Sequence, residues 1–139
     1  MTYLLDTGII SELSSLNPNP QLVQWLDSLP EEMVFISALT LADITERLKM
    51  EKSPTGRDNL SSWLANDLLV RFGGRVCEIT VEVSLKWGEV IAKYKTLMRK
   101  LSLSESLNLA IALVYGHILV SRDTSVFKDA GVKTINPFE

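Results

Sequence analysis

The chain has 139 residues, 46% of them hydrophobic and 22% charged, with a formal net charge of −3. This length predicts a single domain, residues 1–139, that needs no disulfide or structural metal for stability. One cysteine, Cys77, and one histidine, His117, exclude an internal disulfide and an ordinary structural zinc site. The acidic balance disfavours a large non-specific nucleic-acid surface, because such surfaces are basic.

Residues before Asp6 include no basic leader, and the longest apolar region, 107–120, is too short to cross a bilayer. Cys77 lies in an apolar run that is typical of a buried thiol in a reducing compartment. We therefore expect a cytoplasmic protein without a membrane anchor.

The first half of the chain alternates strand and helix patterns. Alternation and apolar residues three or four apart define these segments, and proline and asparagine separate them. They are a strand over 2–6, a short helix over 7–13, a turn at 17–20, a helix that ends at Pro30, a strand over 33–37 and a helix over 40–50.

The second half continues the alternation. Pro54-Thr55-Gly56 predicts a turn before a helix that Gly73-Gly74 stops. Thr80 is the expected cap of the longest helix, and Ser104 the expected cap of the next. The remaining predicted elements are strands over 75–79, 118–121 and 132–135 and helices over 81–97 and 104–115.

Strands separated by helices imply crossover connections and hence parallel pairing. The sequence therefore predicts an α/β fold with three layers, α/β/α, around a mostly parallel central sheet of four to five strands.

Four carboxylates fall at the carboxyl end of a predicted strand or in the first turns of a helix. They are Asp6, Asp43, Glu105 and Asp123. The carboxyl edge of a parallel sheet is where open α/β folds build their sites, so we expect these side chains to converge. Converging carboxylates repel one another, and a divalent cation is the usual compensation.

Each acid also has a purely structural explanation. Asp6 can cap the helix that follows it, although Thr7 can take that place. Asp43 and Glu105 lie where a carboxylate interacts favourably with the helix dipole. Asp123 can cap a turn. The four acids together therefore support a shared site more strongly than any one of them does alone.

Other polar residues accompany the acids. Asn108 lies one turn after Glu105 in an apolar helix and needs a polar partner, for which Glu105 or a metal-bound water would serve. Glu46 is an alternative to Asp43. Basic residues over 93–100 form either a solvated helix face or a track for an RNA backbone. Similarly, Arg122 is either an ordinary surface residue or a phosphate contact.

The opening Leu4-Leu5-Asp6-Thr7-Gly8-Ile9-Ile10-Ser11-Glu12-Leu13 resembles the start of PIN-domain proteins, in particular VapC-type ribonuclease toxins of bacterial toxin–antitoxin pairs. The resemblance covers essentially the whole chain. Further matching segments follow in the same order, at 17–20, 36–43, 72–76, 110–112, 120–124 and 131–139.

This resemblance implies one PIN-like domain over 1–139 that acts as an endoribonuclease dependent on Mg²⁺ or Mn²⁺. It also implies a cognate antitoxin whose tail covers the acidic site, an RNA substrate, a homodimer and no membrane. The implied catalytic residues are Asp6, Asp43, Glu105 and Asp123, of which Asp6, Glu105 and Asp123 bind metal, with support from Ser121 and Asn108.

The chain departs from the family pattern at several positions. Gly8 stands where an asparagine usually orients the first acid, and Val126 where many members carry another aspartate. Asp43 replaces the usual glutamate, and Glu105 the usual aspartate, which changes the reach of each carboxylate by about 1.5 Å. An error of about 1 Å in a reacting group can lower a rate roughly 100-fold. The alternative is a weakened or inactive PIN module that binds an antitoxin or RNA.

Asp6-Thr7-Gly8 also matches the active-site triplet of aspartic proteases. Those enzymes are rich in β-structure, whereas the apolar stripes around Trp63 and Trp87 are helical. The pattern therefore disfavours a protease.

Overall fold

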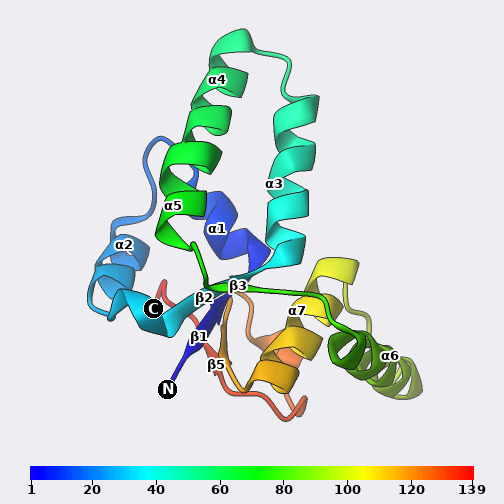
Figure 1. Cartoon of the computed structure of the whole chain (residues 1–139). Coiled ribbons are helices and arrows are strands. Elements are labelled where there is room, and N and C mark those ends of the chain that lie inside the picture. Colours follow the sequence, from blue (N-terminus) through cyan, green and yellow to red (C-terminus); the bar gives the residue numbers. More distant parts are fainter.

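The computed structural model describes all residues, 1–139, and contains a five-stranded sheet in the order β3-β2-β1-β4-β5 (Figure 1). Every neighbouring pair of strands is parallel, which confirms the predicted α/β class. The strands are β1 (Tyr3–Leu5), β2 (Val34–Ser37), β3 (Val76–Cys77), β4 (Ile118–Val120) and β5 (Thr134–Ile135).

Helices connect the strands and cover both faces of the sheet. The α-helices are α1 (Thr7–Leu13), α2 (Pro20–Asp27), α3 (Ala38–Met50), α4 (Pro54–Ser62), α5 (Leu69–Arg71), α6 (Val81–Thr96) and α7 (Leu103–Tyr115). Shorter helical segments are η1 (Glu31–Met33), the π-helical η2 (Trp63–Leu68) and η3 (Ser125–Phe127). None of the helices is long and apolar enough to cross a membrane.

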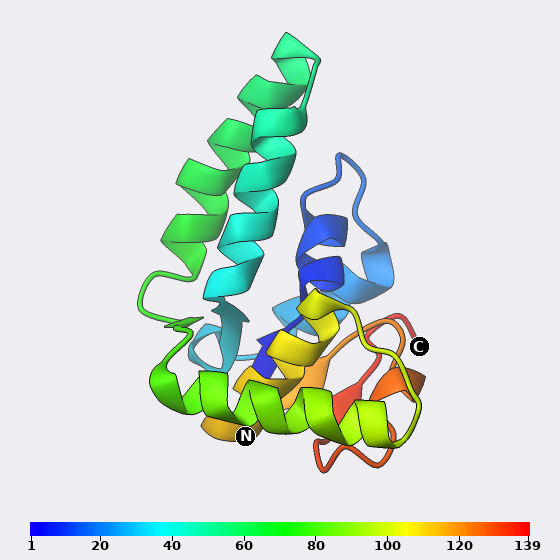
Figure 2. The ribbon, with the colours of Figure 1, turned by 90° about the vertical axis from the view of Figure 1, so that its right-hand side faces the viewer.

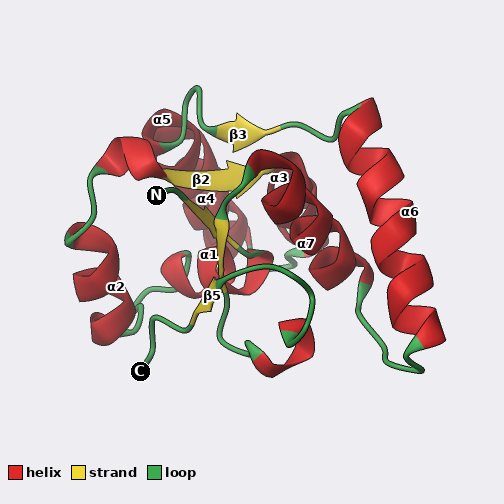
Figure 3. Cartoon of the chain, turned by 90° about the horizontal axis from the view of Figure 1, so that it is seen from below, coloured by secondary structure: helices red, strands yellow, loops and turns green.

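Two apolar cores lie on opposite faces of the sheet. Leu4 packs with residues of α6 and α7, whereas its neighbours Tyr3 and Leu5 pack with residues of α1, α2 and α3. This alternation follows from the strand, in which successive side chains point to opposite faces. Figure 3 shows α6 and α7 on one side of the strands, with α2 and α5 on the other.

A helical hairpin projects from the body of the domain (Figures 1 and 2). One arm is α3, and the other is the run α4-η2-α5. The prediction of a turn at 54–56 is wrong, because these residues form the first turn of α4. Ser53 caps that helix by accepting a hydrogen bond from the Gly56 backbone N–H at 3.2 Å. Proline is tolerated in the first turn, where its missing N–H has no helical acceptor.

His117 is buried immediately before β4. Its Nδ1 lies 2.6 Å from the Thr2 hydroxyl oxygen and its Nε2 lies 3.5 Å from the Cys77 sulfur. The ring stacks with Phe35 and with Tyr115, with centroid distances of 4.6 and 5.9 Å. Burial lowers the pKa of this histidine. His117 is therefore a core residue at the amino edge of the sheet.

Candidate functional site

A polar cavity of about 440 Å³ opens at the carboxyl edge of the sheet. Nine residues line it, from α1, α3 and α7 and from the residues just before α1 and α7, and none is hydrophobic. Three of the four predicted acids are among them: Asp6, Asp43 and Glu105. The topology thus brings together residues that lie about a hundred positions apart in the sequence.

Asp6 is fixed by the backbone on both sides. Its N–H donates to the Val120 carbonyl at 3.0 Å, which continues the pairing of β1 with β4. Its carboxylate accepts a hydrogen bond from the Ile9 N–H at 2.9 Å and so caps α1. Of the two predicted alternatives for the cap, Asp6 and Thr7, the structure has Asp6. Asp6 therefore both caps α1 and lines the cavity.

The electrostatic environment of Asp6 disfavours its charged form. Burial raises the pKa of Asp6, and the nearby negative charge of Glu105 raises it further. The Ser121 hydroxyl and the Ile9 N–H act in the opposite direction but leave the pKa above its usual value. A cation in the cavity would relieve this penalty, because an opposite charge favours the carboxylate.

Glu105 lines the cavity from the first turn of α7. The helix begins one residue earlier than expected, and its cap is Ser102 rather than Ser104. Glu105 accepts a hydrogen bond from the Ser102 N–H and completes a capping box. Asp43 is half-buried in α3, while the alternative acid Glu46 is exposed and lies outside the cavity lining.

Thr7 connects the three helices that meet at the cavity. Its hydroxyl oxygen accepts hydrogen bonds from Ser104 at 3.1 Å and from the Asn108 amide at 3.4 Å. It also lies 3.2 Å from the Thr40 hydroxyl of α3. The polar partner of Asn108 is therefore Thr7, not Glu105. The sequence offered no periodic signal for this role of Thr7 and Ser104, because it depends on three helix starts that meet in space.

The amide oxygen of Asn108 has no hydrogen-bond partner, although the side chain is only 1% exposed. Every other buried side-chain nitrogen or oxygen of the protein has a hydrogen-bond partner. Asn108 lines the same cavity as Asp6 and Glu105. An unpaired amide oxygen beside two carboxylates fits a hard divalent cation, which prefers oxygen ligands.

Asp123 lies outside the cavity lining and is exposed. Its Oδ1 accepts hydrogen bonds from the Ser125 N–H at 3.1 Å and from the Ser125 hydroxyl at 2.6 Å. The structure accordingly contains no group of three acid, histidine or cysteine side chains placed to hold one ion. Ser121 is buried immediately after β4, where its hydroxyl lowers the pKa of Asp6.

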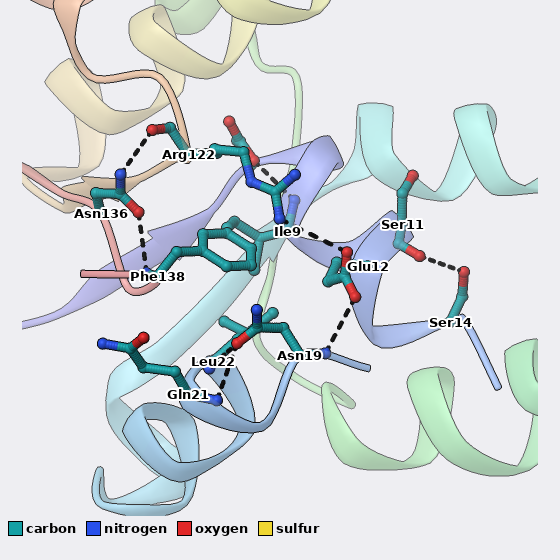
Figure 4. Close-up of polar contacts among 11 residues, drawn as sticks. Ile9, Ser11, Glu12, Ser14, Asn19, Gln21, Leu22, Arg122, Asn136 and Phe138 are labelled. Carbon is teal, nitrogen blue, oxygen red and sulfur yellow. Dashed lines mark hydrogen bonds and ion pairs between the residues drawn. The ribbon is translucent and has the colours of Figure 1, made fainter. Parts of the chain in front are cut away.

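Arg122 points toward the C-terminal segment rather than into the cavity (Figure 4). Its guanidinium lies 3.7 Å from the Glu12 carboxylate and 3.9 Å from the centroid of the Phe138 ring. The Arg122 carbonyl accepts a hydrogen bond from the Asn136 amide at 2.8 Å. Through these contacts Arg122 links α1 to the C-terminal segment.

Comparisons with known proteins agree with this architecture. A family model described as "PIN domain" matches residues 3–133. The chain is 30% identical to VapC ribonuclease Y4jK of Sinorhizobium fredii over 98% of this chain and 97% of that one. It is also 30% identical to toxin FitB of Neisseria gonorrhoeae, over 97% of each chain. The structure of FitAcB from N. gonorrhoeae superposes with a TM-score of 0.91 at 29% identity and covers 99% of both chains.

Proposed function

This chain belongs to the PIN-domain family, and we propose that it hydrolyses RNA phosphodiester bonds at the cavity of Asp6, Asp43 and Glu105. The observation that carries this proposal is the cavity that the half-buried Asp6 shares with Glu105 and with Asn108, whose amide oxygen has no hydrogen-bond partner. A relative named as a ribonuclease, matched over nearly its full length, supports RNA as the substrate.

The proposed cofactor is Mg²⁺ or Mn²⁺. Asp6 and Glu105 would hold it as carboxylates, and Asn108 would offer its free amide oxygen. When bound, such an ion acidifies water and stabilises charge on a phosphate and its leaving oxygen. Ser121 steadies the Asp6 carboxylate. Asp43, which lines the cavity from α3, would orient the attacking water.

Asp123 is proposed as a further carboxylate of the site. It comes three residues after Val120, the last residue of β4, which pairs with β1. Its present hydrogen bonds are both to Ser125, two residues away in the sequence. Exchange of these local bonds for a cation would bring its charge to the edge of the sheet where Asp6 lies.

We further propose that the chain is the toxin of a toxin–antitoxin pair. The relatives named toxin FitB and VapC ribonuclease support this assignment. The expected partner is a small cognate antitoxin whose tail covers the acidic cavity, and the expected assembly is a homodimer of toxin chains. Co-expression with the protein encoded by the adjacent gene, followed by co-purification, tests the pairing.

An RNA-cleavage assay with Mg²⁺ or Mn²⁺ tests the activity. The parent chain should cut RNA with either ion and should not cut it in EDTA. Asp6→Asn should remove the cutting while the protein stays folded, which circular dichroism monitors. Equal cutting by the parent and by Asp6→Asn would overturn the assignment of the site.

One observation favours a second function, that of a PIN-fold module with weakened or absent catalysis. Asp123 lies outside the cavity, and no three acid, histidine or cysteine side chains are placed to hold one ion. Such a module would bind an antitoxin or RNA without cutting. Calorimetric titration with Mn²⁺ separates the two functions, because a folded chain that binds RNA but no metal would be the module.

A further inference from the structure

A cavity of about 330 Å³, separate from the acidic one, lies between α6 and α7. We name it the α6–α7 groove. Aromatic and aliphatic side chains form its walls, among them Trp87, Tyr94 and Leu103, and three cations line it: Lys95, Arg99 and Lys100. No acidic side chain lines this groove. Its lining therefore combines apolar surface with positive charge.

The three cations of the groove have no carboxylate partner. The four ion pairs of the protein involve other residues. Arg99 donates instead to the Lys128 carbonyl at 3.2 Å and lies 5.3 Å from the Tyr94 ring centroid. Lys95 and Lys100 are exposed. In a chain whose net charge is −3, this cluster is a local positive surface suited to an anion.

The aromatic walls are held in place by hydrogen bonds. The Trp87 indole N–H donates to the Ser106 hydroxyl at 2.9 Å, and the Tyr94 hydroxyl donates to the Val126 carbonyl at 2.7 Å. Fixed side chains lose little conformational freedom when a ligand arrives. Leu103 extends the apolar wall to the surface, where it is 61% exposed.

The first turn of α7 separates the groove from the acidic cavity. Leu103 and Ser106 line the groove, whereas Ser104 and Glu105 line the acidic cavity. Figure 2 shows α6 running beside α7 and the connecting segment that leads to this turn. A helix with its side chains is about 10 Å across, so a single extended strand can reach both cavities.

We infer that the α6–α7 groove binds the part of a single-stranded RNA that flanks the bond to be cut. Lys95, Arg99 and Lys100 contact its phosphates, and a base lies against the apolar wall beside Trp87. RNA is favoured over an acidic peptide because the groove adjoins the cavity in which the phosphodiester is placed. This inference rests on the proposed ribonuclease function.

Binding of a short fluorescein-labelled oligouridylate, measured by fluorescence anisotropy in EDTA, tests the groove without cleavage. The test variant is Lys95→Gln/Lys100→Gln, which removes two exposed charges. The control is Lys49→Gln/Lys52→Gln, which makes the same charge change with exposed residues at the tip of the α3–α4 hairpin. Two lost phosphate contacts should weaken binding roughly 20-fold at about 0.1 M salt and reduce the salt slope by about 1.4.

The control variant should bind RNA as the parent does. Equal binding by the parent and the groove variant, with RNA cleavage by the parent, would overturn the groove alone. Equal weakening by both variants would also overturn it, because the effect would then be general electrostatics. If the groove variant loses binding of an oligoglutamate peptide but keeps binding of RNA, the groove is assigned to a protein partner and the RNA inference is overturned. A parent that neither binds nor cuts RNA would overturn the groove and the proposed function together.

Discussion

Glu105 and Ser102 bind each other's backbone N–H groups at the start of α7. The Ser102 N–H donates to Glu105 Oε1 at 2.8 Å, and the Glu105 N–H donates to the Ser102 hydroxyl at 3.0 Å. The same Glu105 side chain lines the acidic cavity. A helix cap and a proposed metal ligand thus coincide in one carboxylate, and substitutions can separate the two roles.

Glu105→Gln should keep the cap and lose the ligand charge. Glutamine also completes a capping box, so the unfolding free energy should stay within about 0.5 kcal/mol of the parent. Mn²⁺ affinity should fall on the order of tenfold, because carboxylate count tunes such sites. Glu105→Ala should show the same fall in Mn²⁺ affinity and should also lose about 1 kcal/mol of unfolding free energy, because it removes the cap. Thermal unfolding and calorimetry measure both effects, and undiminished Mn²⁺ binding by Glu105→Gln would exclude Glu105 as a ligand.

Asp6→Asn should stabilise the metal-free protein near neutral pH. Burial raises the folded pKa of Asp6, so this group contributes stability below its unfolded pKa of about 3.9 and loses that contribution as pH rises through the folded pKa. Asparagine caps helices as well as aspartate does and carries no charge. The gain is about 1.4 kcal/mol for each unit between the two pKa values.

Urea unfolding of both proteins in EDTA at about pH 7 and about pH 3 measures this difference, which should vanish at the lower pH. Cleavage by Asp6→Asn should fall on the order of 10³-fold, since several kcal/mol of charge stabilisation are lost. A variant less stable than the parent at both pH values would show that the cap outweighs the charge.

Asn108→Asp should place a fourth carboxylate in the cavity, beside those of Asp6, Asp43 and Glu105. Without metal it should lower stability on the order of 2 kcal/mol, because the side chain is 1% exposed and lines the same cavity as Asp6. Mn²⁺ should bind more tightly and restore the loss. Asn108→Leu is the matched control: it removes the unpaired oxygen, so metal binding should weaken while the fold persists. Unchanged Mn²⁺ affinity in both variants would separate Asn108 from the metal.

Gly8→Asn should stabilise α1 and hydrogen-bond Asp6. A Cβ at Gly8 would lie 3.4 Å from Asp6 Oδ1, which is ordinary contact, and the backbone there has no positive φ. Replacing a helical glycine of this kind gains about 0.5–1 kcal/mol. Gly8→Ala should gain at least as much, because alanine is the better helix former, but only the asparagine amide should lower the pKa of Asp6. Carboxyl chemical shifts during a pH titration would distinguish them.

Arg122→Ala should destabilise the protein by about 1 kcal/mol and leave RNA cleavage intact. The variant loses the contact with the Phe138 ring and the pair with Glu12, and the 65% exposure of the Arg122 side chain keeps the ionic share small. Arg122→Lys should retain part of the stability. A fall in cleavage without a fall in Tm would instead place Arg122 on the phosphate.

Periodicity and turn residues predicted the order of strands and helices and the parallel sheet. Thr80 caps α6 as expected, by accepting from the Val83 N–H at 3.1 Å. The prediction of Ser104 as the cap of α7 was wrong, although the sequence held a recognisable signal for the correct cap: Ser102 and Glu105 follow the spacing of a capping box. Proline marked residue 54 as a turn, although a first helical turn accepts proline equally well.

The site was less accessible to sequence reasoning than the fold. Topology predicted that Asp6, Asp43, Glu105 and Asp123 meet at one sheet edge, and the cavity lining contains the first three but not Asp123. The direction of a side chain in a loop depends on local hydrogen bonds, such as those from Ser125 that hold Asp123. The contacts of Thr7 depend on the relative height of three helices, which no spacing along the chain encodes.

The position of His117 gives the protein a built-in spectroscopic reporter. It is the single histidine, it is buried against Thr2 and Cys77, and it precedes β4 at the sheet edge opposite Asp6. Its imidazole protons should therefore give isolated NMR resonances that register global packing and ignore ligands at the acidic end. Every variant discussed above can be checked for an intact interior with one spectrum and no added label.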